Sequence, residues 1–144
     1  MAGTAYDTDI VAWAREQARL LRAGRFNGLD IEHIAEEIED VGKSEQRELE
    51  SRMALLLAHL IKWQQQPERR GNSWRRRIKE RRKVIARRLE KTPSLKADLQ
   101  DAGWWELVWG DAVSAVLNEV ELDDLPEVYP WTAADILNGE FWPE

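Results

Sequence analysis

Two histidines and several carboxylates on one acidic stretch are the residues of this sequence that could hold a metal ion. His33, Glu36, Glu37, Asp40 and His59 offer nitrogen and oxygen ligands, and His33 and Glu37 share a helix face. Di-iron bundles use a Glu-x-x-His spacing twice. Here the order is reversed and occurs once. A solvated helix with a histidine–carboxylate pair explains the pattern better, so we expect no metal and no cofactor.

The second histidine also raises the possibility of a general base, which needs a cleft and a reachable partner. His59 lies beside an apolar helix face, with Trp63 one turn further on. This placement favours a packing role. We expect Trp63 to be buried against the C-terminal segment, and His59 to hold a carboxylate or a backbone carbonyl.

A run of basic residues suggests contact with a polyanion. Residues 69–91 hold twelve basic and two acidic residues, although the whole chain has a net charge of −6. A basic helix can follow a phosphate backbone. The candidates for such contacts are Arg75, Arg76, Lys79, Lys83 and Arg87.

The same basic run could instead pair with an acidic stretch of its own chain. Residues 30–50 hold nine acidic and two basic residues. Opposite charges in two segments of one chain indicate either an internal contact or a surface for a partner. For the internal contact, the expected pairs join Glu37 to Arg81 or Arg82.

Eight tryptophans are many for one small core, and tryptophan is enriched at protein interfaces. Trp104, Trp105 and Trp109 crowd one short stretch and are the candidates for a contact with a partner or a second copy. The alternative is that they close one end of a helical bundle.

The composition indicates a globular, all-α protein of one domain over residues 1–144. Charged residues make up 33%, glycine and proline are few, and cysteine is absent. No apolar run approaches the roughly 20 residues that cross a bilayer. We therefore expect a cytoplasmic protein without membrane contact. The sequence has no glycine-rich phosphate loop, serine nucleophile motif or redox pair, so an enzyme is not indicated.

Apolar periodicity predicts an antiparallel bundle of four main helices and a short C-terminal one. The second helix is long, with a kink or break expected near Gly42. Ile10, Trp13, Ala14, Ala18 and Leu21 are predicted to form the core face of the first helix. Ile31, Ile34, Ala35, Ile38 and Val41 are predicted to form that of the first half of the second helix. The core face of its second half is predicted to consist of Leu49, Met53, Leu56, Leu57, Leu60 and Ile61, and the narrow apolar face of the third helix of Trp74, Ile78, Ile85 and Leu89. The predicted helices span residues 8–23, 30–66, 73–91, 93–120 and 132–137.

Several motifs together resemble the domain-of-unknown-function family 29, a bacterial family of small helical proteins without an assigned activity. They are AEEIEDVG (35–42), SEQRELESR (44–52), LLAHLIKWQQQPERR (56–70), SW (73–74), PSL (93–95), PWT (130–132) and FWP (141–143). The resemblance implies an all-helical fold and carries no catalytic residue. This sequence departs from the family at two positions. Gln65 stands where the family often has an aromatic residue, and Tyr129 stands where it often has a cysteine.

These observations favour a non-enzymatic protein-interaction module that associates with a protein partner or with itself. The alternative is a binder of nucleic acid or another polyanion through residues 73–91. A metal-dependent enzyme using His33, Glu37 and His59 is the third hypothesis.

Overall fold

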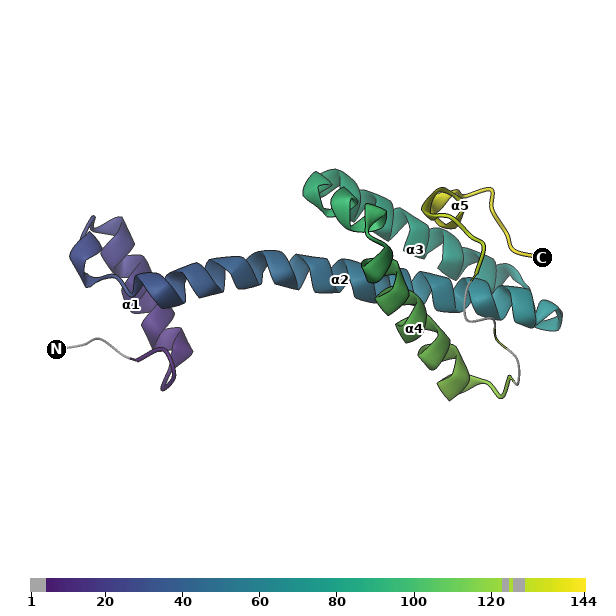
Figure 1. Cartoon of the computed structure of the whole chain (residues 1–144), viewed down its shortest axis with the longest axis horizontal. Coiled ribbons are helices and arrows are strands. Elements are labelled where there is room, and N and C mark those ends of the chain that lie inside the picture. The colour runs from purple at the N-terminus through teal and green to yellow at the C-terminus, as the bar shows by residue number, and fades with distance from the viewer. Residues whose placement is uncertain (1–4, 123–124, 126–128) are drawn as a thin grey trace. The chain divides into compact units, whose positions relative to one another are not determined.

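All regular structure in the described part of the chain is helical. The computed structural model describes residues 5–122, 125 and 129–144. Its elements are α1 (Ile10–Arg22), η1 (Phe26–Gly28), α2 (Ile31–Gln65), η2 (Pro67–Arg69), α3 (Asn72–Lys91), η3 (Pro93–Gln100), α4 (Ala102–Glu119) and α5 (Ala133–Leu137), where η marks a 3₁₀ helix (Figure 1). The all-α prediction is confirmed. No helix among these residues is long and apolar enough to cross a membrane.

The chain divides into two compact units, residues 1–45 and residues 46–144. Helix α2 contributes its first half to the first unit and its second half to the second. Each unit has its own internal packing. The single domain over residues 1–144 stays a prediction.

Helix α2 contradicts the predicted interruption near Gly42, because residues 31–65 form one uninterrupted α-helix. A helical glycine costs about 1 kcal/mol relative to alanine, too little to end a helix of good helix formers on both sides. The helix ends instead just before Pro67, whose ring cannot continue the hydrogen-bond pattern.

In the first unit, α1 buries a different face from the predicted one. Trp13, Gln17 and Leu20 are buried, whereas Ile10 and Leu21 are each 47% exposed. The prediction that Ile10 and Leu21 belong to the core is therefore wrong. Helix α1 starts after the N-cap Asp9, whose carboxylate accepts the backbone N–H of residue 12 at 3.1 Å.

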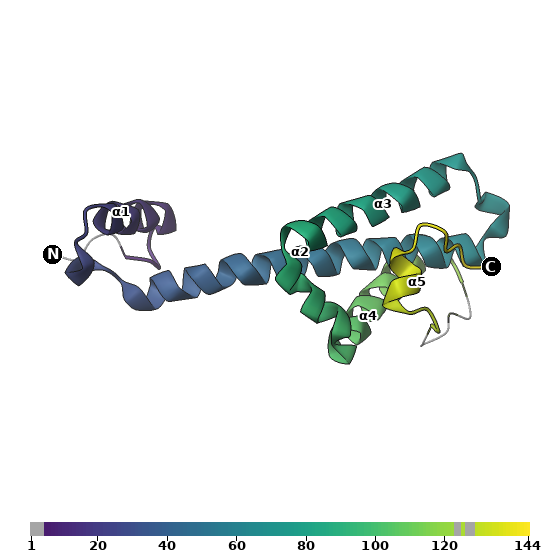
Figure 2. The ribbon, with the colours of Figure 1, turned by 90° about the horizontal axis from the view of Figure 1, so that it is seen from above.

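The second unit holds the main core, and here periodicity predicted burial well. Figures 1 and 2 show α3 running back alongside the second half of α2, with α4 crossing this pair. The predicted α2 residues of this core are all fully buried: Leu49, Met53, Leu56, Leu57, Leu60 and Ile61. Ile78, Ile85 and Leu89 of α3 join them, as predicted.

The predicted helix over residues 93–120 is in fact two elements, η3 and α4. Asp101 separates them because its side chain caps α4, accepting the Gly103 N–H at 2.9 Å. The short helix α5 is confirmed. Thr132 and Asp135 form a capping box at its start, and Ile136 is fully buried.

Candidate interaction surface

An apolar stripe on the first half of α2 is solvent-exposed. Ile31, Ile38 and Val41 are 69%, 67% and 68% exposed, and Ile34 between them is half-buried. We call these four residues the α2 seam. The prediction that this stripe belongs to the core is wrong.

The α2 seam is exposed because α1 and the chain before it cover another face of the helix. The Tyr6 ring stacks on His33, with centroids 4.1 Å apart, and Trp13 meets His33 edge-on at 6.3 Å. The Tyr6 hydroxyl donates to the Glu37 carboxylate. This bond, first among the causes, raises the pKa of Tyr6 to about 12. Aromatic and polar contacts therefore occupy the face that bears His33 and Glu37.

Asp30 fixes the start of α2 against α1. Its carboxylate lies 2.7 Å from His33 Nδ1 and accepts the Trp13 Nε1–H at 3.0 Å. Its backbone N–H donates to Gln17 Oε1 at 2.8 Å. The bond to Asp30 raises the pKa of His33, and the bond to His33 lowers the pKa of Asp30. The buried Gln17 thus accepts the backbone N–H of the residue that precedes α2.

The α2 seam has the spacing of two heptads of a coiled coil. Its residues occupy alternating three- and four-residue steps, the positions that face a partner helix. Two small residues, Ala35 and Gly42, lie beside it, and a Cβ on Gly42 would meet nothing within 4 Å. Residues 30–41 also hold six carboxylates and no lysine or arginine. The arrangement suits a helical partner.

The metal candidates are not assembled into a site. His33 is paired with Asp30 and Glu37 with Tyr6, while Glu36 is exposed and His59 belongs to the second unit. Over residues 5–122, 125 and 129–144, no group of three or more histidine, aspartate or glutamate side chains could hold a metal ion. Asp40, also a candidate, is half-buried.

His59 is a half-buried ring in a positive environment. Burial, followed by the charges of Lys62, Arg81 and Arg77, lowers its pKa to about 4, so the ring is neutral near pH 7. In the part of the chain that the structure describes, it forms no hydrogen bond to a carboxylate or a carbonyl. Trp63 is 5% exposed and packs on Trp142, with centroids 4.8 Å apart, as predicted.

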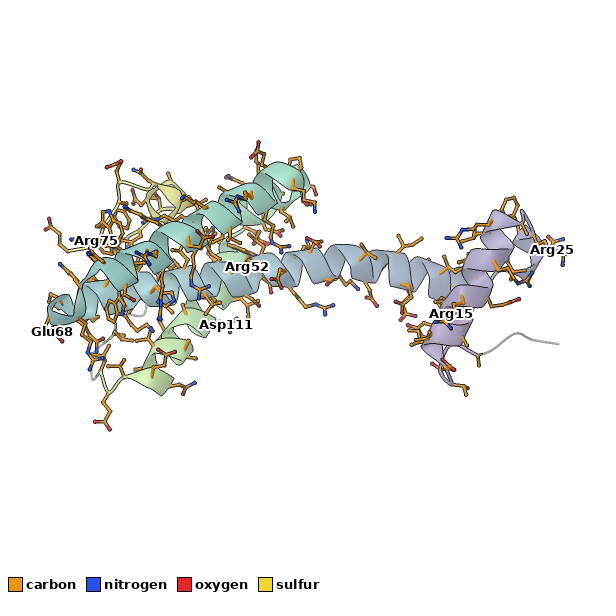
Figure 3. All side chains as sticks on the ribbon, turned by 180° about the vertical axis from the view of Figure 1, so that it is seen from behind. Arg15, Arg25, Arg52, Glu68, Arg75 and Asp111 are labelled. Atoms are coloured by element: carbon orange, nitrogen blue, oxygen red, sulfur yellow. The ribbon has the colours of Figure 1, made fainter. Side chains whose placement is uncertain are left out.

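The polyanion candidates all lie on exposed positions of α3: Arg75, Arg76, Lys79, Lys83 and Arg87. Arg75, labelled in Figure 3, also lies over the Trp63 ring, with its Cζ atom 5.5 Å from the ring centroid. Their role in binding stays a prediction.

The tryptophan candidates pack within the second unit. Trp104 is 8% exposed, and the Trp105 indole N–H donates to the Leu99 carbonyl at 2.8 Å. Trp109 stacks on Tyr129, with centroids 4.8 Å apart. These contacts favour the packing interpretation over an interface, which stays a prediction.

The family model described as "Domain of unknown function DUF29" matches residues 5–142, nearly the whole chain. The chain belongs to the DUF29 family. No curated protein and no solved structure matches it. The resemblance seen in the motifs is thus confirmed, and it leaves the activity of this DUF29 chain to be argued from its own residues.

One structural residue of the DUF29 chain was misread from the sequence. Arg82 is 5% exposed and donates from Nε to the Ile136 carbonyl at 2.8 Å and from Nη2 to the Phe141 carbonyl at 2.7 Å. Its partners are backbone carbonyls, so the expected pairing of Arg82 with Glu37 is wrong. The signal was present, because residue 82 continues the buried spacing of Ile78 and Ile85.

Proposed function

We propose that this chain is a protein-interaction module whose contact surface is the α2 seam. The observation that supports it is the exposure of Ile31, Ile38 and Val41 at coiled-coil spacing. Of the ten large apolar residues that are exposed in the described part of the chain, seven fall within its first 45 positions. Large exposed apolar patches in a soluble protein mark interaction sites.

The apolar contact alone is too small for tight binding. Burying the exposed parts of three such side chains contributes on the order of 3–6 kcal/mol. The loss of free motion on association costs about 4–15 kcal/mol. A partner must therefore add further contacts or charge complementarity.

The charge of the surface defines the partner's chemistry. With six carboxylates and no lysine or arginine over residues 30–41, the α2 seam of a second copy would bring acidic residues against acidic residues. An amphipathic helix with an apolar stripe and lysine or arginine flanks complements both features. The proposed partner is therefore a protein that presents a basic amphipathic helix.

A synthetic peptide tests this pairing. The probe is a helical peptide of leucine and lysine at heptad spacing, labelled for fluorescence anisotropy, with the full chain as titrant. We expect the double variant Ile38→Gln, Val41→Gln to weaken binding at least about ten-fold, since it removes two apolar anchors. The matched control is Leu117→Gln, because Leu117 is 48% exposed on α4, and it should leave the affinity unchanged.

Two outcomes would overturn the proposal. One is equal binding of the peptide by wild type and the double variant. The other is a dimer in sedimentation equilibrium that the double variant abolishes, because a second copy would then occupy the α2 seam.

The exposed cations of α3 support a second candidate, binding of nucleic acid. Phosphate contacts release counterions, so affinity for a DNA or RNA oligonucleotide should fall steeply with salt. Arg76→Ala with Lys79→Ala should weaken it regardless of base sequence. No binding at low salt would end this candidate.

A further inference from the structure

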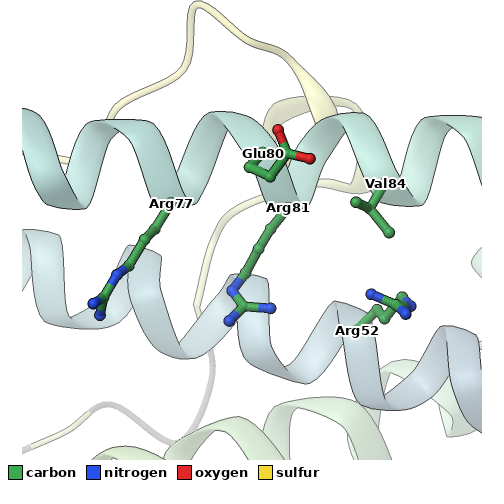
Figure 4. A pocket seen from close by; sticks show the side chains of 5 residues that line it. All are labelled: Arg52, Arg77, Glu80, Arg81 and Val84. Atoms are coloured by element: carbon green, nitrogen blue, oxygen red, sulfur yellow. The ribbon is translucent and has the colours of Figure 1, made fainter.

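A cavity of about 230 Å³ opens between α2 and α3 of the second unit. Arg52 of α2 lines it together with Arg77, Glu80, Arg81 and Val84 of α3. Figure 4 shows Arg77 and Arg81 extending side by side from α3 toward α2, with Arg81 between Arg77 and Arg52. We propose that this cavity is a binding site for a phosphate dianion, held by Arg81 together with Arg77 and Arg52 on either side of it.

Two of these cations lack an anion among the described residues. Arg52 Nε lies 2.9 Å from Glu48 Oε1, which is close enough for an ion pair although the N–H does not point at the oxygen. Among the residues that the structure describes, no carboxylate lies within 4 Å of the Arg77 or Arg81 guanidinium. Three arginines and Glu80 leave the lining with a net charge of +2, which matches a dianion rather than a carboxylate.

One donor beside the cavity is unsatisfied. Within the described part of the chain, Arg81 Nε is buried and has no hydrogen-bond partner. Buried donors in proteins are nearly always paired, so this N–H favours an acceptor that enters the cavity. An arginine fork binds a phosphate through two parallel N–H···O bonds to two of its oxygens.

The guanidinium groups beside the cavity repel one another. Burial, and then the charges of Arg52 and Arg77, lower the pKa of Arg81. Arg81 and Arg77 also contribute to the lowered pKa of His59. An anion among these groups would relieve the repulsion of all of them.

The size of the cavity limits the ligand. At about 230 Å³ it lies below the range of about 300–1,000 Å³ that drug-sized ligands occupy. A phosphate group fits, either as inorganic phosphate or as the end of a small phosphomonoester. Phosphodiesters of nucleic acid carry one charge each, and this separates the proposal from polyanion binding on the exposed side of α3.

The test is a titration of the full chain with inorganic phosphate at constant ionic strength, followed by NMR of the arginine side-chain Nε–Hε signals. We expect the Arg77 and Arg81 signals to shift and saturate. Arg77→Gln should weaken binding at least about ten-fold, since it removes a charge-assisted contact. Arg81→Gln should do the same, and Arg77, which is exposed, supplies the variant that leaves folding unaffected.

Arg47→Gln is the matched control, because Arg47 is an exposed arginine of α2 and does not line the cavity. It should change the affinity for phosphate less than about two-fold. The proposal is overturned if phosphate causes no shift up to about 10 mM, or if Arg47→Gln weakens binding as much as Arg77→Gln. A phosphodiester oligonucleotide that binds these arginines while phosphate does not would overturn it as well.

Discussion

Replacing Arg82 by methionine should loosen the C-terminal segment from the second unit. The guanidinium bonds the Ile136 and Phe141 carbonyls and sits over the Trp142 ring at 5.4 Å. Methionine keeps much of the apolar stem but removes both hydrogen bonds. The two carbonyls then lose their donors.

The expected loss follows from these contacts. Each hydrogen bond from a charged donor contributes about 1.5–3 kcal/mol. Removing the buried charge offsets part of this loss of stability, because the charged guanidinium no longer has to be desolvated. Burial lowers the pKa of Arg82, which shows the same desolvation. We therefore expect Arg82→Met to lower the free energy of unfolding by about 2–4 kcal/mol.

Urea denaturation of the full chain measures this loss, and hydrogen exchange locates it. The amides of α5 should exchange much faster in Arg82→Met than in wild type, whereas those of the α2 core should follow the global stability. Lys83→Met is the matched control, since Lys83 is the neighbouring exposed cation, and it should change stability by less than about 0.5 kcal/mol. A loss below about 1 kcal/mol in Arg82→Met, or an equal loss in Lys83→Met, would refute the reasoning.

Further expectations concern single residues. Gly42→Ala should raise the free energy of unfolding by about 1 kcal/mol in urea denaturation, because the added Cβ meets no atom within 4 Å; a decrease would show that the helix is not regular there. Trp63→Ala should cost about 3–5 kcal/mol in the same assay, since the ring is 5% exposed, and an unchanged midpoint would remove the packing argument. The lowered pKa of His59, about 4, means that the unfolded chain binds this proton first, so stability should fall as the pH drops from about 6.5 to 4; His59→Gln should remove this fall, and an unchanged pH profile would contradict it. The raised pKa of His33 acts oppositely: its pairing with Asp30 stabilises below about pH 6.5, until the carboxylate is protonated, and is lost as the pH rises through the raised value. His33→Gln should flatten that dependence in thermal melts recorded across this pH range. The same pH dependence in His33→Gln and wild type would contradict the pairing.

The sequence predicted the second unit better than the first, for a physical reason. Along residues 49–61 the apolar face is broad, and α3 offers a complementary stripe, so periodicity and burial agree. In the first unit, packing includes the stack of Tyr6 on His33 and the hydrogen bond that Gln17 accepts from the Asp30 backbone N–H. Such contacts carry no periodic signal, so the α2 seam was wrongly assigned to a core.

Charge patterns alone also could not identify partners. The basic run was visible, yet one arginine of α3, Arg82, is buried on backbone carbonyls, while Arg77 and Arg81 line a cavity with Arg52 of another helix. Only the packing of α2 on α3 brings these side chains together. The candidate phosphate site therefore had no signature in the sequence.

Cysteine labelling tests the exposure and the docking role of the α2 seam most directly, because the chain contains no native cysteine. Three single variants would be compared for alkylation rate: Val41→Cys in the α2 seam, Leu117→Cys as an exposed control and Leu56→Cys as a fully buried one. We expect Val41→Cys to react as fast as Leu117→Cys, and the leucine–lysine peptide to slow only Val41→Cys, by about ten-fold at saturation. A Val41→Cys variant that reacts as slowly as Leu56→Cys, or that the peptide does not protect, would contradict it.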